Sequence, residues 1–407
     1  MNIDLYKTLK EFEYTRTSGS KEELQTANKI REKISGESSL QEFKVSIFDS
    51  RDVILKSDDK EYEVSAINAS GSNVDIKAPF YYMETTLDID KKELNKKIVL
   101  INGLITKDIY EKLIKNSASA FISFSGDIID DPSLTDLEIK ELREPLRRLG
   151  VIPGVHMRAK TAMELVRDNP QTLKLSFKQT TKEVISNNII AEIKGNTFSN
   201  EVIVITAHYD SVMYSKGVYD NASGSVLILK LYNYFLANPP KRTVRFIWCG
   251  SEERGLLGSK AYVNSLTEEE LDKIILNINV DVAGSILGID ECIVTAEDKL
   301  ANYLEYISKE EGLIVKVVQD IYSSDSIPFA DKKIPAINLC RFGVRGTAHI
   351  HTRYDNMSFI SEKSLNNTYK ILEHISNRLI NAYSFPVKKE ISEEITKKID
   401  QYLYKNR

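Results

Sequence analysis

The sequence is poor in cysteine and lacks long apolar runs, and both shortages limit what the protein can be. Three cysteines in 407 residues are few and odd in number, so they indicate no disulfide framework and favour a reducing compartment. No window approaches the roughly 20 apolar residues of a membrane span. Charges stand in the opening MNIDLYKTLKEFEY, where a secretory signal would need an apolar run, so we expect a cytoplasmic protein without membrane attachment.

A strong surplus of charge is also lacking. The formal net charge is -4 at pH 7, which gives no general attraction to nucleic acid or to anionic membranes. Hydrophobic residues make up 42% of the chain and charged residues 28%, the composition of an ordinary globular protein with enough apolar surface for a core. At this length, two domains are the natural expectation.

Strand-like and helix-like segments alternate regularly only in part of the chain. From about residue 186 onward, apolar strands such as EVIVITAHYD and IILNINVDV are separated by helical patterns. This pattern favours a mixed, mostly parallel α/β sheet sandwiched by helices. Residues 53–184 instead have the pattern of a self-contained α+β unit. We therefore predict one domain formed by residues 1–52 and 185–407, with a smaller α+β domain inserted at 53–184.

Two terminal segments are predicted to be helices. Ser20 and Glu23 have the spacing of a capping box. The apolar residues that follow at helical spacing are Leu24, Ala27, Ile30 and Ile34. The tail repeats apolar residues four apart, at Val387, Ile391, Ile395, Ile399 and Leu403. The tail helix could dock on the body of the protein or on a second subunit, so a homo-oligomer is left open.

Acidic and histidine side chains follow the apolar strands, at the points where the strands are predicted to end. In an open α/β sheet, ligands bind outside the carboxyl ends of the strands, so these residues are candidates for one site. In chain order they are His208, Asp210, Asp220, Glu252, Glu253, Asp281 and His351. Each alone is a weak signal, because a strand-end aspartate is usually a turn residue and a glutamate pair is usually a solvated face. Their shared position is what indicates a site.

The chemical type of these side chains indicates a metal centre. Imidazole and carboxylate without thiolate suit zinc or a similar divalent metal in a catalytic site. Two cations would also offset the repulsion between the adjacent carboxylates of Glu252 and Glu253. Residues i and i+2 of a strand share a face, so Asp210 can receive the far ring N–H of His208.

The chain has five histidines, and they differ in setting. His349 and His351 share a face only if their segment is extended, so one of the two could be a bystander. His156, in the segment 53–184, and His374 have no comparable setting. We expect ordinary core or surface roles for these last two.

Six short motifs, in this order, resemble a known family: AHYDS, YDNASG, SEERGLLGS, NVDVAG, SDSIPF and IHTRYDN. They are similar to the zinc-dependent aminopeptidases of the aminopeptidase Y and bacterial leucyl aminopeptidase type. The resemblance covers about residues 187–384, and the first fifty residues loosely. The segment 53–184 resembles the protease-associated domain that many members carry as an insertion. The resemblance implies the fold of zinc aminopeptidases and carboxypeptidases.

The resemblance also implies a role for each matching residue and two zinc ions per chain. The implied ligands are His208 and Asp281 for one zinc, Glu253 and His351 for the other, and Asp220 as the bridge between them. Glu252 would be the general base, and Asp210 the partner of His208. Asp355, in the HTRYD motif, would support its loop. Several relatives have a tyrosine where this chain has Ile350, which leaves the oxyanion donor open.

The function implied is that of a metallo-aminopeptidase, which hydrolyses peptides with a free N-terminus one residue at a time. Two metals would share and activate a water, and Glu252 would relay its proton. The alternatives left open are a related zinc hydrolase or acyltransferase, carboxypeptidase-like or glutaminyl-cyclase-like, and a non-catalytic binding protein. The last is disfavoured because every ligand position and the base are filled. Side-chain preference, native metal, and the role of the inserted domain do not follow from the sequence.

Overall fold

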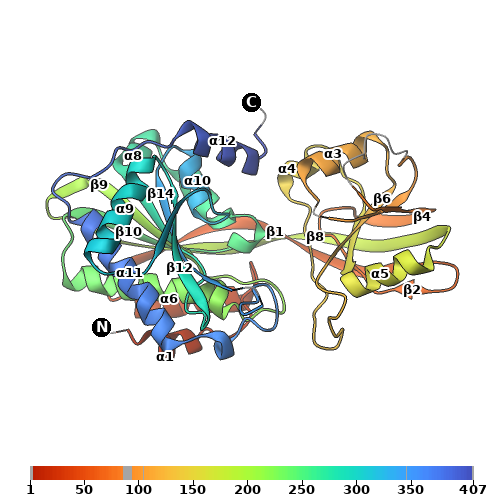
Figure 1. The fold of residues 1–407 in the computed structure, drawn as a ribbon, viewed down its shortest axis with the longest axis horizontal. Helices are drawn as coiled ribbons and strands as arrows, with labels where there is room; N and C mark the ends of the chain where they lie inside the picture. Colours follow the sequence, from red (N-terminus) through yellow and green to blue (C-terminus); the bar gives the residue numbers. More distant parts are fainter. Residues whose placement is uncertain (1–2, 86–93, 104, 345, 406–407) are drawn as a thin grey trace. The chain divides into compact units, whose positions relative to one another are not determined.

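The computed structural model describes residues 3–85, 94–103, 105–344 and 346–405, and the chain divides into two compact units. One comprises Met1–Val45 and Val184–Arg407 and is called the discontinuous unit below; the inserted unit comprises Ser46–Glu183. The sequence-based boundaries lie at 52/53 and 184/185. Each unit is built around its own stretch of β-sheet (Figure 1).

The sheet of the discontinuous unit is mixed and mostly parallel, which confirms the predicted fold class. Its strand order is β13-β12-β14-β11-β9-β10-β8, and β14, β11, β9 and β10 run parallel to one another. β12 is antiparallel to β14, and β8 is antiparallel to β10. The strands are β8 (Thr172–Ile193), β9 (Phe198–His208), β10 (Arg242–Cys249), β11 (Ile274–Val280), β12 (Gly288–Thr295), β13 (Lys316–Gln319) and β14 (Ala336–Gly343), with β1 (Ser38–Lys56) paired to β8.

Helices cover both faces of this sheet in two sets (Figure 1). The set that shares the largest apolar core is α1 (Leu5–Lys10), α2 (Lys21–Lys33), α6 (Ser223–Ala237), α9 (Asp298–Glu310) and α11 (Glu362–Ile380). The second set is α7 (Leu257–Ser265), α8 (Glu268–Lys273) and α10 (Ser326–Asp331), with α12 (Glu393–Tyr402) packed on α10. Among the described residues, no helix has both the length and the apolar character needed to span a bilayer.

The parallel core of the sheet brings the carboxyl ends of its strands to one edge. The β9 run Ile203–Ala207 is fully buried because helices cover it on both faces. The register pairs His208, the last residue of β9, with Cys249, the last residue of β10. β11 lies on the other side of β9 and ends at Val280, so the residue after it reaches the same edge.

The inserted unit has a second mixed sheet with its own apolar core. Its strand order is β8-β4-β5-β6-β7-β3, with β4 to β7 parallel and both outer pairs antiparallel. The bounds of its strands are β2 (Glu61–Tyr62), β3 (Ser65–Ala66), β4 (Asn73–Met83), β5 (Ile98–Ile101), β6 (Ala120–Ser125) and β7 (Gly154–Arg158). Its helices are α3 (Lys107–Lys115), α4 (Glu144–Arg147) and α5 (Ala159–Asp168). Strand residues and α5 supply most of the core.

Two expectations about strands were wrong. The segments LKLSFKQTTKEV (173–184) and NNIIAEIKG (187–195) each have a strand pattern and fall in different predicted domains, so separate strands were expected there. They instead form one strand, β8, whose first half pairs with β4 and second half with β10. No glycine or proline interrupts this run, so the backbone stays extended. The strand β12 was missed, because the adjacent charged residues Asp290 and Glu291 interrupt the apolar pattern of GIDECIVT.

The two terminal helices also differ from expectation. Leu24 is 44% exposed, because α2 turns Glu23, Ala27 and Ile30 inward instead. The tail helix is shorter than predicted and begins only after Ser392, whose side chain caps it by accepting from Ile395 N. The tail helix packs on the body of the discontinuous unit, where its apolar face meets Ala330.

Candidate metal centre

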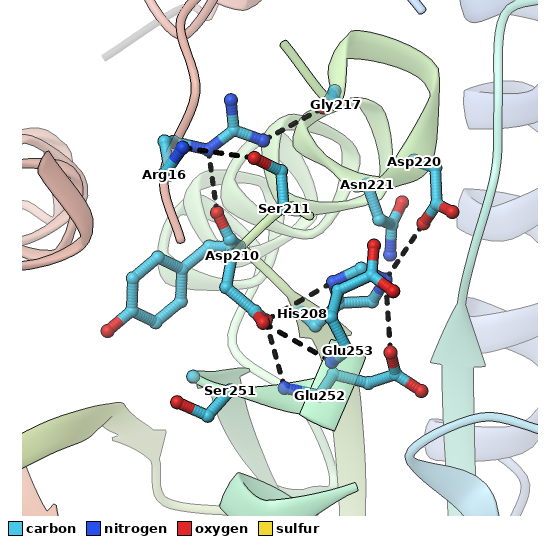
Figure 2. Close-up of polar contacts among 12 residues, drawn as sticks. Arg16, His208, Asp210, Ser211, Gly217, Asp220, Asn221, Ser251, Glu252 and Glu253 are labelled. Carbon is cyan, nitrogen blue, oxygen red and sulfur yellow. Dashed lines mark hydrogen bonds and ion pairs between the residues drawn. The ribbon is translucent and has the colours of Figure 1, made fainter. Parts of the chain in front are cut away.

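The candidate ligands lie at the edge of the discontinuous unit's sheet where its parallel strands end. Figure 2 shows four of these residues, His208, Asp220, Glu252 and Glu253. They come from the end of β9 (His208), the turn η2 (Val218–Ala222) before α6 (Asp220), the turn η3 (Glu252–Arg254) after β10 (Glu252, Glu253), the residue after β11 (Asp281) and the loop after β14 (His351). Two groups of potential metal-binding atoms form among them, each with its atoms within 4.8 Å of one another. The structure thus brings together all the residues that the sequence analysis singled out for one site.

The first set, called the His208 group, consists of His208, Asp220 and Asp281. The Nε2 atom of His208 lies 3.1 Å from an oxygen of Asp220 and 3.5 Å from an oxygen of Asp281. All three residues are buried. The buried strands β9 and β11 position His208 and Asp281, so two of the three members of this group stand at the ends of core strands.

The second set, called the His351 group, consists of Asp220, Glu253 and His351. The Nε2 atom of His351 lies 3.0 Å from Glu253 Oε2 and 3.3 Å from Asp220 Oδ2. The His351 side chain is 43% exposed, and the backbone of this residue has a φ of 60°. This group therefore depends on loops and opens to solvent, unlike the His208 group.

Asp220 belongs to both groups, and its backbone is held in place. One of its oxygens faces His208 and the other faces His351. The carboxylate of Asp355 accepts hydrogen bonds from Tyr219 N (2.6 Å) and Asp220 N (3.0 Å), which gives Asp355 a supporting role. Gly224 lets α6 start close to the sheet, because a Cβ there would lie 2.6 Å from the carbonyl oxygen of Val280.

The two adjacent glutamates lie on one turn, and their side chains point in different directions. Glu253 reaches the His351 group, whereas Glu252 Oε2 lies 3.9 Å from His208 Nε2 (Figure 2). Asp210 holds both residues by accepting from Glu252 N (3.0 Å) and Glu253 N (3.2 Å). The turn opens at Ser251 with φ 53° and closes at Gly255 with φ 103°.

Asp210 does more for this turn than for the histidine it was predicted to orient. Its Oδ1 lies 3.4 Å from His208 Nδ1, too far for a strong hydrogen bond. Its contacts with the two backbone N–H groups are shorter. Asp210 therefore links His208 and the glutamate turn, since one carboxylate faces both.

Burial and crowding shift the pKa values across the site. Although burial alone would lower it, the surrounding carboxylates, with Glu252 foremost, raise the pKa of His208 well above its usual range. Burial would also lower the pKa of His351, but hydrogen bonds to Asp220 and Glu253 outweigh this effect and raise that pKa to about 11. Burial raises the pKa of Glu252 well above its usual range, and burial with the nearby Asp220 charge raises the pKa of Glu253 to about 7.

The donor set fits a divalent metal. Asp281 Oδ1 and Glu253 Oε1 are buried and have no hydrogen-bond partner, so each is an orphaned acceptor at a ligand position. Two imidazoles and three carboxylates suit zinc in catalytic sites, which lack the thiolates common in structural ones. A divalent cation in each group would satisfy the orphaned oxygens and offset the repulsion among the carboxylates.

Three buried residues near the site were missed by the sequence analysis: Arg16, Glu23 and Asp325. Arg16 is fully buried, and its side chain donates to backbone carbonyls, including Tyr209 O (2.7 Å) and Gly217 O (2.8 Å) (Figure 2). Its backbone N–H donates to Ser211 Oγ (3.0 Å). It thereby ties down the loop between His208 and Asp220. No motif marks such a residue, because a charged side chain in an N-terminal segment usually faces water.

Asp325 occupies the SDSIPF motif, which the sequence analysis placed near the wall of the site without a role for this residue. It is buried, and neither carboxylate oxygen has a hydrogen-bond partner in ordinary geometry. Burial raises the pKa of Asp325 to about 6, with His208 as its nearest opposing charge. Asp325 thus adds another carboxyl group beside the His208 group.

The remaining histidines lie apart from both groups. His349 is exposed and packs near the rings of Tyr354 and Phe359, so it is the bystander of the HIH pair. His374 contacts Glu311 at 3.2 Å on the outside of α11. His156 is buried in the inserted unit, where it contacts two serines.

Comparison with known proteins agrees with this geometry. Residues 188–376 match the model of peptidase family M28. The matched segment lies within the unit that holds the candidate metal centre. The match contains His208, Asp220, Glu252, Glu253, Asp281 and His351, and it excludes Arg16 and Glu23.

Similar proteins include characterised peptidases. Aminopeptidase YwaD of Bacillus subtilis is 32% identical over 223 residues, which are 53% of this chain and 48% of YwaD. Leucine aminopeptidase 2 of Trichophyton rubrum is 46% identical over 98 residues, which are 24% of this chain and 20% of that protein. The matched segments thus span about half or less of these curated relatives.

Solved structures match this chain over more of its length. An aminopeptidase from Aneurinibacillus sp. strain AM-1 has a TM-score of 0.74 at 25% identity and covers 96% of this chain and 95% of its own. BSAP, a zinc aminopeptidase from Bacillus subtilis, has a TM-score of 0.77 at 24% identity and covers 96% and 98%. Both matches extend through the inserted unit, so the fold is shared over nearly the whole chain.

Proposed function

We propose that the protein is a zinc aminopeptidase that removes N-terminal residues from peptides and holds two zinc ions per chain. The observation that carries the proposal is Asp220, which offers one oxygen to each of two ligand groups with Glu252 beside them. The M28 family match and the similar aminopeptidases support the reaction class.

The residues fit the work that this reaction requires. His208 and Asp281 would hold one zinc, Glu253 and His351 the other, and Asp220 both. Bound zinc supplies a Lewis acid and lowers the pKa of the attacking water.

The chain's own groups do the rest of the chemistry. Glu252 takes a proton from the attacking water and passes it to the leaving amine. Asp210 keeps Glu252 aimed by accepting its backbone N–H. Asp355 keeps Asp220 aimed in the same way. The preference for peptides with a free amine rests on the similarity to aminopeptidases.

The inserted unit is proposed to be a protease-associated-like domain, as the sequence resemblance implies. Its insertion between β1 and β8 and its separate core support this assignment. Among its described residues, no group of metal-binding side chains forms, so we assign the chemistry to the discontinuous unit.

The first test measures metal content and hydrolysis together. We expect about two zinc equivalents per chain and cleavage of aminoacyl-p-nitroanilides that chelation abolishes. Equal cleavage of N-acetylated and free peptides would refute the aminopeptidase assignment and favour another hydrolase of this fold. Metal-free protein that stays inert after zinc is added would instead favour a binding protein.

The second test separates the two glutamates. Glu252→Gln should abolish turnover while leaving the metal bound, and Glu253→Ala should lose metal. Glu268→Gln, an exposed residue of α8, serves as the matched control and should behave like wild type. Activity that survives in the Glu252→Gln variant would show that another residue is the base.

A further inference from the structure

A carboxylate from helix α2 is buried behind the glutamate turn. Glu23 is 1% exposed, although helix α2 carries charged residues that face water. Its Oε1 atom accepts from Ser251 N (3.1 Å), Ser251 Oγ (3.2 Å) and Ser186 Oγ (2.8 Å). Its Oε2 atom accepts from Gly19 N (2.6 Å). Burial, with the nearby Asp210 charge, raises the pKa of Glu23 to about 8, and these hydrogen bonds oppose that rise. Four donors lie within the acceptor capacity of its two oxygens.

Ser251, the residue that Glu23 contacts twice, sets the direction of the turn. Its φ of 53° lies in the left-handed region, which costs a non-glycine residue on the order of 1–2 kcal/mol. Such a conformation persists only where the surroundings hold it. Asp210 holds the next two N–H groups, so two carboxylates together hold three successive residues, Ser251 to Glu253.

Helix capping alone does not account for Glu23. Ser20 already caps α2 by accepting from Glu23 N at 3.0 Å, and the bond from Gly19 completes this end of the helix. The three bonds to Oε1 lead away from the helix, to β8 and to the turn. A residue needed only for the helix would not have to be buried there, since burying a carboxylate is costly unless it is fully hydrogen-bonded.

We propose that Glu23 is a positioning residue of the glutamate turn. Its carboxylate fixes Ser251, so that Glu252 and Glu253 keep their separate directions toward the His208 and His351 groups. The side-chain hydrogen bonds of Glu23 lead to Gly19, Ser186 and Ser251, which are not candidate ligands. Glu23 also lies outside the segment that matches the family model. The kinetic consequence rests on the proposed peptidase function, whereas the effect on the turn does not.

The test compares Glu23→Gln with Glu22→Gln. Glutamine has the shape of glutamate and keeps one acceptor oxygen, but its amide nitrogen only donates. One side of the group, either toward Ser251 and Ser186 or toward Gly19, therefore loses its acceptor. Glu22, the preceding residue, is half-exposed and faces only Lys21 in its ion pair, so it is the matched control. Hydrogen exchange is followed in peptides that cover residues 249–256, with and without zinc, together with kcat and KM.

In the Glu23→Gln variant we expect exchange in the 249–256 peptides to rise about tenfold, while the rest of the discontinuous unit stays as in wild type. The kcat should fall about 10- to 100-fold with KM within about threefold, because misplacing a catalytic group costs rate more than binding. Glu22→Gln should match wild type in all readouts.

A folded Glu23→Gln variant with wild-type exchange at the turn overturns the proposal, and so does a uniform rise across the whole unit. If the wild type hydrolyses no peptide but the turn still responds, positioning by Glu23 stands and the peptidase assignment fails. Should Glu23→Gln not fold, Ser251→Gly tests the same contact, because it removes the Oγ bond and suits a positive φ. It should show a smaller change in the same direction, and unchanged exchange would overturn the proposal.

Discussion

His208 in the discontinuous unit and His156 in the inserted unit are buried to the same extent, each 2% exposed, yet their environments push them in opposite directions. Carboxylates surround His208 and raise its pKa well above the usual range, against the effect of burial. Burial, with the nearby Lys140 charge, lowers the pKa of His156 to about 4. Burial alone therefore does not decide the state of a histidine.

The neighbouring groups of the two histidines explain why their pKa values shift in opposite directions. Ser123 and Ser125 place their Oγ atoms 2.9 Å from Nδ1 and Nε2 of His156, so both ring nitrogens are engaged by neutral groups. The acid nearby, Glu138, accepts from Ser125 and pairs with Lys140. The His156 network is satisfied by itself. In the His208 group, by contrast, Asp281 Oδ1 is buried without a hydrogen-bond partner. A buried acceptor without a partner distinguishes a candidate metal centre from a polar contact in the core.

The largest expected effect is the loss of activity when His208 is removed, compared with the small change when His156 is replaced. His208→Ala should reduce peptidase activity by more than about a hundredfold, because a lost ligand costs more than the 10- to 100-fold of a lost ligand support. His156→Gln should stay within about twofold of wild type. Steady-state kinetics on an aminoacyl-p-nitroanilide measure the activity of both variants. Equal losses of activity in the two variants would contradict the prediction.

Metal removal should destabilise one unit and not the other. A ligand present at 100 to 1,000 times its Kd stabilises the unit that binds it by about 2.7–4.1 kcal/mol, and stripping it removes this amount. Trp248, the single tryptophan, is buried in β10 and reports on the discontinuous unit by fluorescence during urea unfolding. Hydrogen exchange in β6 and β7 reports on the inserted unit. A loss of protection in β6 and β7 on chelation would contradict this prediction.

Acid should weaken the inserted unit through His156. Its pKa is lower in the folded protein, about 4, than the ordinary value of 6.5, so the folded unit favours the neutral ring. The stabilisation is complete above pH 6.5 and is lost as the pH falls toward 4, by up to about 3 kcal/mol. Hydrogen exchange of peptides from β7, followed over a series of urea concentrations at pH 7 and at pH 4.5, measures this loss of stability. His156→Gln should flatten the dependence, and a slope that survives in this variant would point to other groups.

The smallest expected effect concerns the hydroxyl partners. Ser125→Ala leaves His156 Nε2 without this partner and should cost the inserted unit about 1–3 kcal/mol. Peptidase activity should not change, because no candidate ligand lies in this network. A drop in kcat for this variant would show that the inserted unit contributes to the chemistry.

Much of the candidate centre could be predicted because parallel strands deliver their ends to one edge. His208 and Asp281 follow apolar runs that are recognisable as strands, and the same argument placed Glu252 and Glu253. The choice of His351 over His349 came from the resemblance, and the structure places only His351 in a ligand group. The roles of these residues stay predictions until they are measured.

Other features could not be predicted from local pattern. Glu23 looks like a solvated helix residue, and only packing shows that it faces the glutamate turn. Arg16 is similar, since its side chain also donates to the distant backbone carbonyls of Tyr209, Lys216 and Gly217. The strand β12 was missed because its alternation is weak, and pairing with β14 decides its conformation.

The sequence by itself determined the kinds of side chain at the strand ends and the alternation of strand and helix, because hydrophobic periodicity and ligand chemistry are local properties. Tertiary structure alone decided which oxygens face each other across Asp220, how the glutamate turn is aimed and which distant charges are buried behind it. These features depend on contacts between segments far apart in the chain, and only the folded chain makes those contacts.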